Sequence, residues 1–208
     1  MLVRILSLSF VLFMSCQSML AQEGWEDVED RVGQTQWNNM ELKEGIYRTF
    51  EEFKSNSPSI IGEFELRTKY LLLKDTGNAW VQVNEDRIWG CFKDGKIYIS
   101  KDEGLWRCIN VGRLLQFATI KIERYFDPNP SSFGGAGTMR EQSVTKQYFL
   151  DTETGEVFIL NSRNFAPYAD QEPSLKDFKP KSKNKVAQTI LLLKAYNELN
   201  PLKLNTNE

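Results

Sequence analysis

The chain has 208 residues, with 26 Lys or Arg and 28 Asp or Glu, so its formal net charge is −2. This balance does not predict a nucleic-acid partner, because proteins that bind nucleic acids normally carry a clear basic excess. The sequence contains no His, which excludes Ser-His-Asp and Cys-His catalysis and His-ligated zinc. It predicts no cofactor, no metal site and no catalytic residue.

Residues 1–21 have the layout of a secretory signal peptide. Arg4 precedes an apolar run at 5–14, and small or polar residues follow as far as Ala21. The apolar run is about half as long as a helix that spans a bilayer. The sequence therefore predicts export to the periplasm or the medium, with no transmembrane helix in the mature chain.

Two ways of processing this leader stay open. Cleavage after Ala21 would leave Gln22 as the first mature residue, although Met19 is a poor residue at position −3. Alternatively, cleavage before Cys16 would give an outer-membrane lipoprotein, although only Ser15 matches the usual lipoprotein motif there. An acylated Cys16 would tether the domain to a membrane surface without a spanning helix.

After the leader, residues 22–43 are acidic and poor in aliphatic side chains, and we expect a flexible lead-in. Within 44–54, Ile46, Phe50 and Phe53 recur at the i, i+4, i+7 spacing of one helix face. This spacing predicts a short amphipathic helix, which ends before Pro58 because the residue preceding a proline disfavours helical geometry.

Strand patterns then dominate the sequence. Segments rich in β-branched and aromatic residues alternate with short polar turns, at 64–66, 70–73, 79–83, 87–92, 96–100 and 105–111. Loops this short predict antiparallel neighbours in a meander. A further strand is expected within 112–126, followed by an irregular loop at 127–138 and a hairpin made by 144–151 and 156–160.

The meander also bears on the two cysteines outside the leader, Cys91 and Cys108. They lie on the first and third strands of a three-strand run, and alternate strands are about 9.6 Å apart. A disulfide needs Cα atoms within about 7 Å. We therefore expect two free, buried thiols.

The end of the chain predicts helices. Ser162 is a plausible N-cap, 173–178 can form a short turn of helix, and 182–199 carries a broad apolar face that ends before Pro201. Residues 202–208 are expected to be a disordered tail. The predicted fold is α+β, a single domain at 44–201 with an antiparallel meander of about six to nine strands, a short N-terminal helix and a C-terminal helical segment.

Four aromatic residues are the main candidates for a binding site. Exposed on one sheet face, they would form a stacking platform for sugars or a protein partner; the other interpretation is that they pack in the core. These residues are Trp80, Trp89, Tyr98 and Trp106.

Carboxylates offer an alternative from a different class of function. A glycan-directed hydrolase could use two acids in one cleft, and the acids near the expected turns are Glu85, Asp86, Asp102 and Asp127. A glycine-rich stretch at 133–137 could bind an anion, although it lacks the ending of a P-loop. Five lysines between Lys176 and Lys185 could contact an anionic envelope surface, or could form a solvated linker.

Four segments, in this order, resemble a family of exported Bacteroidota-type proteins of unknown function. They are GIYRTFEEFKSNSP at 45–58, IWGCFKDGKIYI at 88–99, YFLD with GEV at 148–157, and YNELNP at 196–201. The resemblance covers about 44–201. It implies export and assigns no activity to any residue. The function expected is a non-catalytic envelope or secreted module that binds an envelope protein, a glycan or a small ligand, or that has a structural role.

Overall fold

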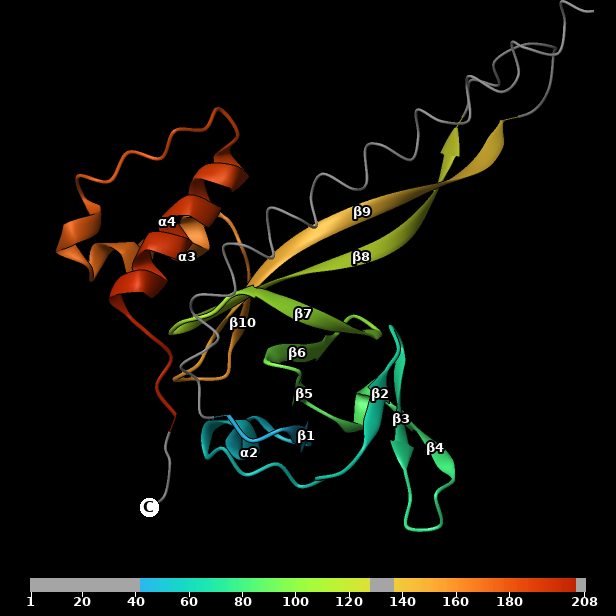
Figure 1. Cartoon of the computed structure of the whole chain (residues 1–208). Helices are drawn as coiled ribbons and strands as arrows, with labels where there is room; N and C mark the ends of the chain where they lie inside the picture. Colours follow the sequence, from blue (N-terminus) through green and yellow to red (C-terminus); the bar gives the residue numbers. More distant parts are fainter. Residues whose placement is uncertain (1–41, 128–136, 205–208) are drawn as a thin grey trace, which may run out of the picture. The chain divides into compact units, whose positions relative to one another are not determined.

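The computed structural model describes residues 42–127 and 137–204. The leader with Cys16, the lead-in up to residue 41, most of the glycine-rich stretch at 133–137, and residues 205–208 of the tail lie outside this range. The predicted fold class is confirmed: antiparallel sheets combine with helices (Figure 1). The ten strands form two sheets, one of seven strands and one of three.

The seven-stranded sheet has the order β1-β5-β6-β7-β8-β9-β10, so six consecutive strands form the predicted meander. All its neighbouring strands are antiparallel. Its strands are β1 (Gly45–Tyr47), β5 (Gly90–Lys93), β6 (Lys96–Lys101), β7 (Gly104–Asn110), β8 (Leu114–Asp127), β9 (Thr138–Asp151) and β10 (Val157–Ile159). A Cβ at Gly90 would run into the backbone of Tyr98 on β6, so the close approach at the start of β5 requires glycine.

The second sheet comprises β2 (Phe64–Leu66), β3 (Tyr70–Lys74) and β4 (Trp80–Asn84), and the short 3-10 helix η1 (Glu85–Arg87) leads from it to β5. Phe64 and Leu71 of this sheet share a buried cluster with Ile46, Cys91 and Leu105 of the larger sheet. The small sheet is thus held by apolar contacts with the large one rather than by strand pairing with it.

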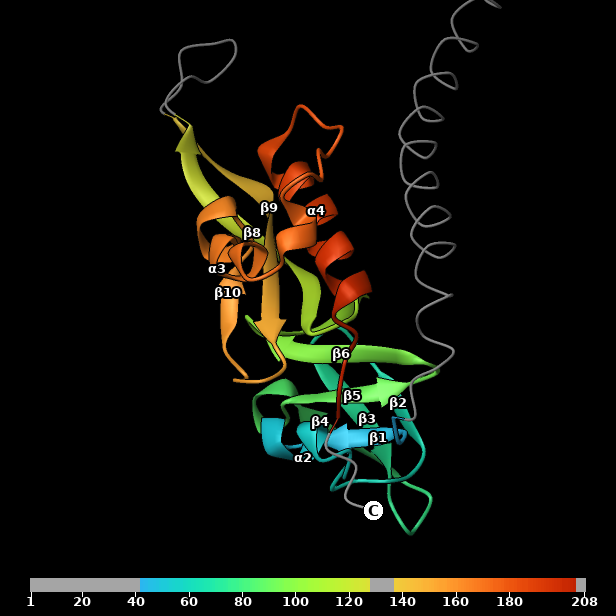
Figure 2. The ribbon, with the colours of Figure 1, turned by 90° about the vertical axis from the view of Figure 1, so that its left-hand side faces the viewer.

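Helices follow the meander, as the sequence predicts. They are α3 (Ser162–Asp170), the 3-10 helix η2 (Pro173–Leu175) and α4 (Lys185–Leu199), and Figure 2 shows α3 and α4 beside β8, β9 and β10. The side chain of Asn161, not that of the predicted Ser162, caps α3 by accepting from the Asn164 amide, and the side chain of Asn184 caps α4. Phe165, Leu193 and Tyr196 of these helices bury Leu114 and Phe149 of the sheet.

A buried amide also ties α4 to the start of β8. The Asn197 side chain donates to the Leu114 carbonyl at 2.7 Å and accepts from the Leu114 amide at 3.1 Å. Asn197 and Leu114 are both buried, so these bonds satisfy the backbone N–H and carbonyl groups of Leu114, which water does not reach. Gly112 lies against the same side chain, where a Cβ would not fit.

The expected helix across 44–54 is only partly present. Residues Gly45–Tyr47 form β1, and the helix α2 spans Phe50–Lys54. Ile46 pairs with Cys91 and forms a bridge with Ile60, so strand pairing outweighs the helical spacing of its side chain. Thr49 then caps α2 by accepting from the Glu52 amide. The last two residues of the expected flexible lead-in are docked on the domain, since Leu42 is buried and the Lys43 amide donates to Asn56.

Cys91 and Cys108 are free and buried, as the strand geometry predicts. They lie on β5 and β7, with β6 between them. Cys91 lies opposite Tyr98, and Tyr98 lies opposite Arg107, so these three side chains project from the same face of the sheet. Cys108 follows Arg107 in β7, so its side chain projects from the opposite face. Burial raises the pKa of the Cys91 thiol to about 12 and also raises that of Cys108.

The β8–β9 hairpin is much longer than its neighbours. Each of its strands has 14 residues, whereas strands in globular proteins usually have about five or six. In the part of the chain that the structure describes, β7 pairs with β8 only at Gln116 and Phe117, and β10 pairs with β9 only from Tyr148 to Leu150. The outer half of the hairpin therefore continues beyond both neighbouring strands (Figure 1).

Candidate functional site

The strongest candidate site is this outer half, which we call the arm: Ile120–Asp127 of β8 and Thr138–Thr145 of β9. The two strands pair without interruption, from Ile120 opposite Thr145 to Asp127 opposite Thr138. The arm would reach roughly 27 Å if fully extended, at about 3.4 Å per residue. Nearly all its side chains are exposed, whereas the inner ends of the same strands are buried.

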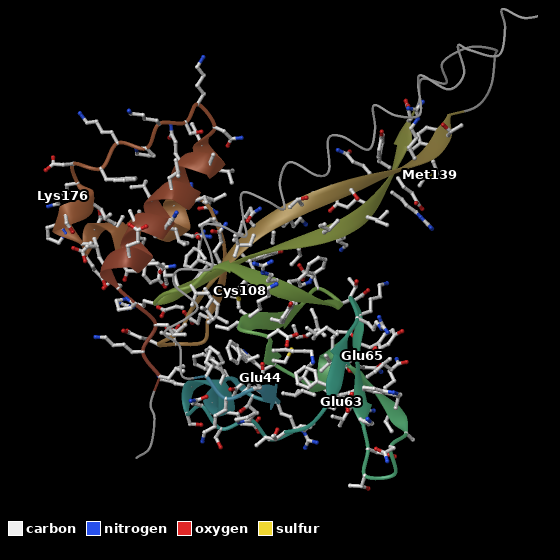
Figure 3. The ribbon with its side chains drawn as sticks, viewed as in Figure 1. Glu44, Glu63, Glu65, Cys108, Met139 and Lys176 are labelled. Carbon is white, nitrogen blue, oxygen red and sulfur yellow. The ribbon has the colours of Figure 1, made fainter. Side chains whose placement is uncertain are left out.

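One face of the arm is apolar. Even-numbered positions of β8 and odd-numbered positions of β9 lie opposite one another and share this face. Its large apolar side chains are exposed by 56% at Ile120, 63% at Ile122, 58% at Phe126 and 65% at Met139. Figure 3 labels Met139 near the outer end of the hairpin. An exposed group of apolar side chains rimmed by polar ones is typical of an interaction surface.

A single ion pair interrupts this apolar face. The Arg124 guanidinium lies 2.8 Å from the Glu141 carboxylate, directly across the strand pair and between Ile122 and Phe126. Both side chains are more than half exposed, so the pair contributes little to stability. It supplies a polar group within an apolar surface, where it can orient a partner.

The opposite face of the arm carries charged residues in diagonal pairs. Arg140 lies 2.9 Å from Asp127, and Lys146 lies 3.5 Å from Glu123. Lys121 and Tyr125 occupy the same face. The two faces of one hairpin thus differ in chemistry, and the apolar face is the one that gains from being covered.

Among the four aromatic candidates, Trp80 is on a separate sheet from the rest. It lies on β4, 42% exposed, with the Lys74 ammonium 5.8 Å from its ring centre. Trp89 immediately precedes β5 and packs against α2, with its ring centre 4.5 Å from that of Phe53 and 5.8 Å from that of Phe50.

Tyr98 and Trp106 point to opposite faces of the large sheet. Tyr98 is opposite Arg107, whereas Trp106 is opposite Ile99, the next residue along β6. Tyr98 packs against the buried cluster beneath the small sheet, and burial raises the pKa of its hydroxyl. The Trp106 indole donates to the Lys101 carbonyl at 2.7 Å. The structure therefore does not bring the four rings together on one surface.

The four carboxylates that the sequence offered as candidates for a hydrolase site also lie on different elements. Glu85 and Asp86 lie in η1, Asp102 accepts from the Tyr148 hydroxyl at 3.0 Å, and Asp127 pairs with Arg140 at the outer end of the arm. None of them lines either of two cavities on the described surface. Within residues 42–127 and 137–204, no group of three or more Cys, Asp or Glu side chains could hold a metal ion.

The first cavity, of about 310 Å³, lies where the turn after β9 meets the end of α4, and the Arg113–Glu153 ion pair at 2.8 Å forms part of its wall. The second, of about 420 Å³, has an apolar floor that includes Leu73 and Val83, flanked by Arg48 and Arg87. The five lysines of the basic cluster, among them Lys176 in Figure 3, are all exposed around the loop before α4.

No family model, curated protein or solved structure matches this chain. Among the residues that the structure describes, no helix is both long and apolar enough to cross a bilayer. The site must therefore be interpreted from its own geometry.

The length of the strand expected within 112–126 already indicates the arm. Ile120 and Ile122 alternate with polar residues along the expected strand, but the returning strand was predicted only from Val144 onward. A strand spanning most of 112–126 needs a partner of similar length, so the polar segment at 138–143 has to be its partner. In the structure those residues form the outer part of β9.

Proposed function

We propose that this chain is an exported, non-catalytic binding module that docks a partner protein through the apolar face of the arm. The observation that carries the proposal is the exposure of Ile120, Ile122, Phe126 and Met139 on one face of a hairpin that extends past its neighbouring strands. Covering these side chains would remove apolar surface from water, which favours association.

The chemistry of this face favours a protein partner over a glycan. Sugar rings stack on exposed aromatic rings, and the four aromatic candidates lie on separate surfaces. The apolar face of the arm instead presents two isoleucines and a methionine with one aromatic ring, that of Phe126, and the Arg124–Glu141 ion pair lies between them. Methionine at an exposed position adapts its shape to a partner surface, and the ion pair within the face can select a complementary charge.

Export is supported by the leader at 1–21 and by the resemblance to exported proteins. Cleavage after Ala21 would release the module into the periplasm or the medium, and acylation of Cys16 would hold the same module at the outer membrane. In either form the arm would be available to a protein of the envelope or the medium. A catalytic role has no comparable support, because the candidate carboxylates share neither of the two cavities.

Photo-cross-linking tests the proposal. A photoreactive amino acid at position 139, on the apolar face, should yield one discrete cross-linked product with a different protein in the cells that produce this chain. The matched control places the same group at position 142, which is exposed on the charged face of the arm. The absence of a product from position 139, or the same product from both positions, would contradict docking through the apolar face.

A further inference from the structure

The arm has a second feature, which is independent of its apolar face. In the described part of the chain, no strand pairs with the outer edge of β8 beyond Phe117. Thr119 still contacts Asp102, and the exposed part of β8 begins at Ile120. An exposed strand edge presents amide and carbonyl groups that can pair with another strand, and a two-stranded hairpin by itself is only marginally stable. We propose that the strand that completes this edge is the same edge of a second copy of this chain, paired antiparallel about a two-fold axis at Ile122.

Symmetry limits the ways in which two such edges can pair. A two-fold axis that relates antiparallel strands of one sheet is perpendicular to that sheet, so residues opposite one another project from the same face. Opposed residue numbers must therefore add up to the same even number throughout the paired segment. The charged residues of the arm on β8 are Lys121, Glu123, Arg124 and Asp127.

One register alone places opposite charges together without opposing like charges. With the axis at Ile122, Lys121 lies opposite the partner's Glu123 in both symmetry-related positions, and Arg124 lies opposite the neutral Ile120. An axis at residue 121, 123 or 124 would place a charged residue against its own copy. An axis at residue 125 would oppose Glu123 to Asp127. Like charges directly opposite one another destabilise a strand pair, whereas opposite charges stabilise it.

The edge of β9 does not offer such a register. Its charged residues within and next to the arm are Arg140, Glu141 and Lys146. Glu141 is an odd number of positions from each cation, so the opposite charges always project from different faces of the strand. The charge pattern therefore selects the edge of β8 and one register on it.

Pairing about Ile122 would create a four-stranded sheet from two arms. Because the axis is perpendicular to this sheet, the apolar faces of the two copies lie side by side on the same surface. Ile122 lies against its own copy at the centre, and the paired backbone groups of Ile120–Arg124 gain hydrogen-bond partners. The dimer would thus present an apolar face twice as wide as that of one arm.

Charge exchange tests the register. The molar mass of the purified protein, measured by light scattering across a concentration series, should correspond to two chains. Lys121→Glu and Glu123→Lys should each weaken the dimer at least tenfold, because each opposes like charges at two positions. The double variant K121E/E123K should restore it. As a control, Gln142→Lys on the exposed β9 strand should leave the mass unchanged. A wild-type protein with the mass of one chain, or a double variant no better than either single variant, would overturn the proposal.

A cysteine at the axis provides a second test. Opposed residues in antiparallel strands have Cα atoms about 4.5–5.5 Å apart, which is within disulfide range. In a Cys16→Ser background, Ile122→Cys should form a reducible covalent dimer on mild oxidation, whereas Ser143→Cys on β9 should not. Equal cross-linking of both, or of neither, would contradict the register. Failure of these tests would leave cross-linking from position 139 to a different protein unaffected, so the proposed function and this inference can fail separately.

Discussion

The inner and outer halves of the β8–β9 hairpin share one continuous strand ladder but have opposite environments. At the inner end, Leu115 lies opposite Leu150, and both are fully buried. At the outer end, Phe126 lies opposite Met139, and both are more than half exposed. Backbone pairing is the same in both halves, so pairing by itself does not determine which residues belong to the core.

The difference arises from what lies against each half. The inner half is covered by the α3–α4 pair and flanked by β7 and β10. Beyond Phe117 and Tyr148 the pairing with these neighbouring strands ends, while the two strands continue. The inner half therefore stabilises the fold, and the outer half leaves apolar side chains and strand edges available for association.

The largest expected effect is on the stability of the inner half. Phe149 is fully buried and packs against the rings of Phe158, Phe165 and Tyr168. Phe149→Ala should lower the free energy of unfolding by about 3–5 kcal/mol, because it removes a large apolar side chain and leaves a cavity. Met139→Ala in the arm should change it by less than about 0.5 kcal/mol. Urea titration followed by circular dichroism measures both, and equal losses would show that the arm is as well packed as the core.

A smaller effect is expected where α4 holds the start of β8. Asn197→Ala should lower the free energy of unfolding by about 2–4 kcal/mol, because it leaves the buried amide and carbonyl of Leu114 without their partner. The exposed neighbour Glu198→Ala is the matched control and should be nearly neutral. Amide exchange should also be faster at the inner end of β8 than in the wild type. A variant as stable as the control would mean that the backbone of β8 does not depend on α4.

The smallest expected effect is a pH dependence of the stability, caused by Cys108 on β7, the strand that flanks the inner half. Cys108 lies opposite Phe117, and burial raises the pKa of its thiol above the ordinary value of 9.0. Above pH 9 the unfolded chain loses this proton while the folded chain keeps it, so stability should fall as the pH rises, by about 1.4 kcal/mol per pH unit for this group. Urea titrations at pH 8 and pH 10 should give a steeper fall for the wild type than for Cys108→Ala. Parallel profiles would indicate that Cys108 is not shielded from water.

Much of the fold was predictable because its signals are local. Alternating side chains and short polar turns predicted β5, β6 and β7 as a meander, and the spacing of alternate strands predicted free thiols at Cys91 and Cys108. The helix α4 followed from its apolar face, and α3 was predicted with its cap one residue too late, at Ser162 instead of Asn161. Each of these features depends on residues close together in the chain.

The features that the sequence predicted wrongly depend on contacts between segments that are distant in the chain. Ile46 has the spacing of a helix face, but its backbone pairs with Cys91, 45 positions later, and this pairing makes β1 a strand. The separation of β2, β3 and β4 into a sheet of their own has the same origin, because it depends on which strand edges meet. This separation places Trp80 on a different sheet from Trp106.

By itself, the sequence determined most of the strands and helices and the absence of any imidazole chemistry, and it predicts the export leader. It also determined the charge order along β8, from which the proposed register follows. Only the tertiary structure decided that the α3–α4 pair covers the inner hairpin and leaves the outer half exposed. The physical reason is that alternation sorts side chains onto two faces, but which face is covered, and over what length, depends on elements that are distant in the chain.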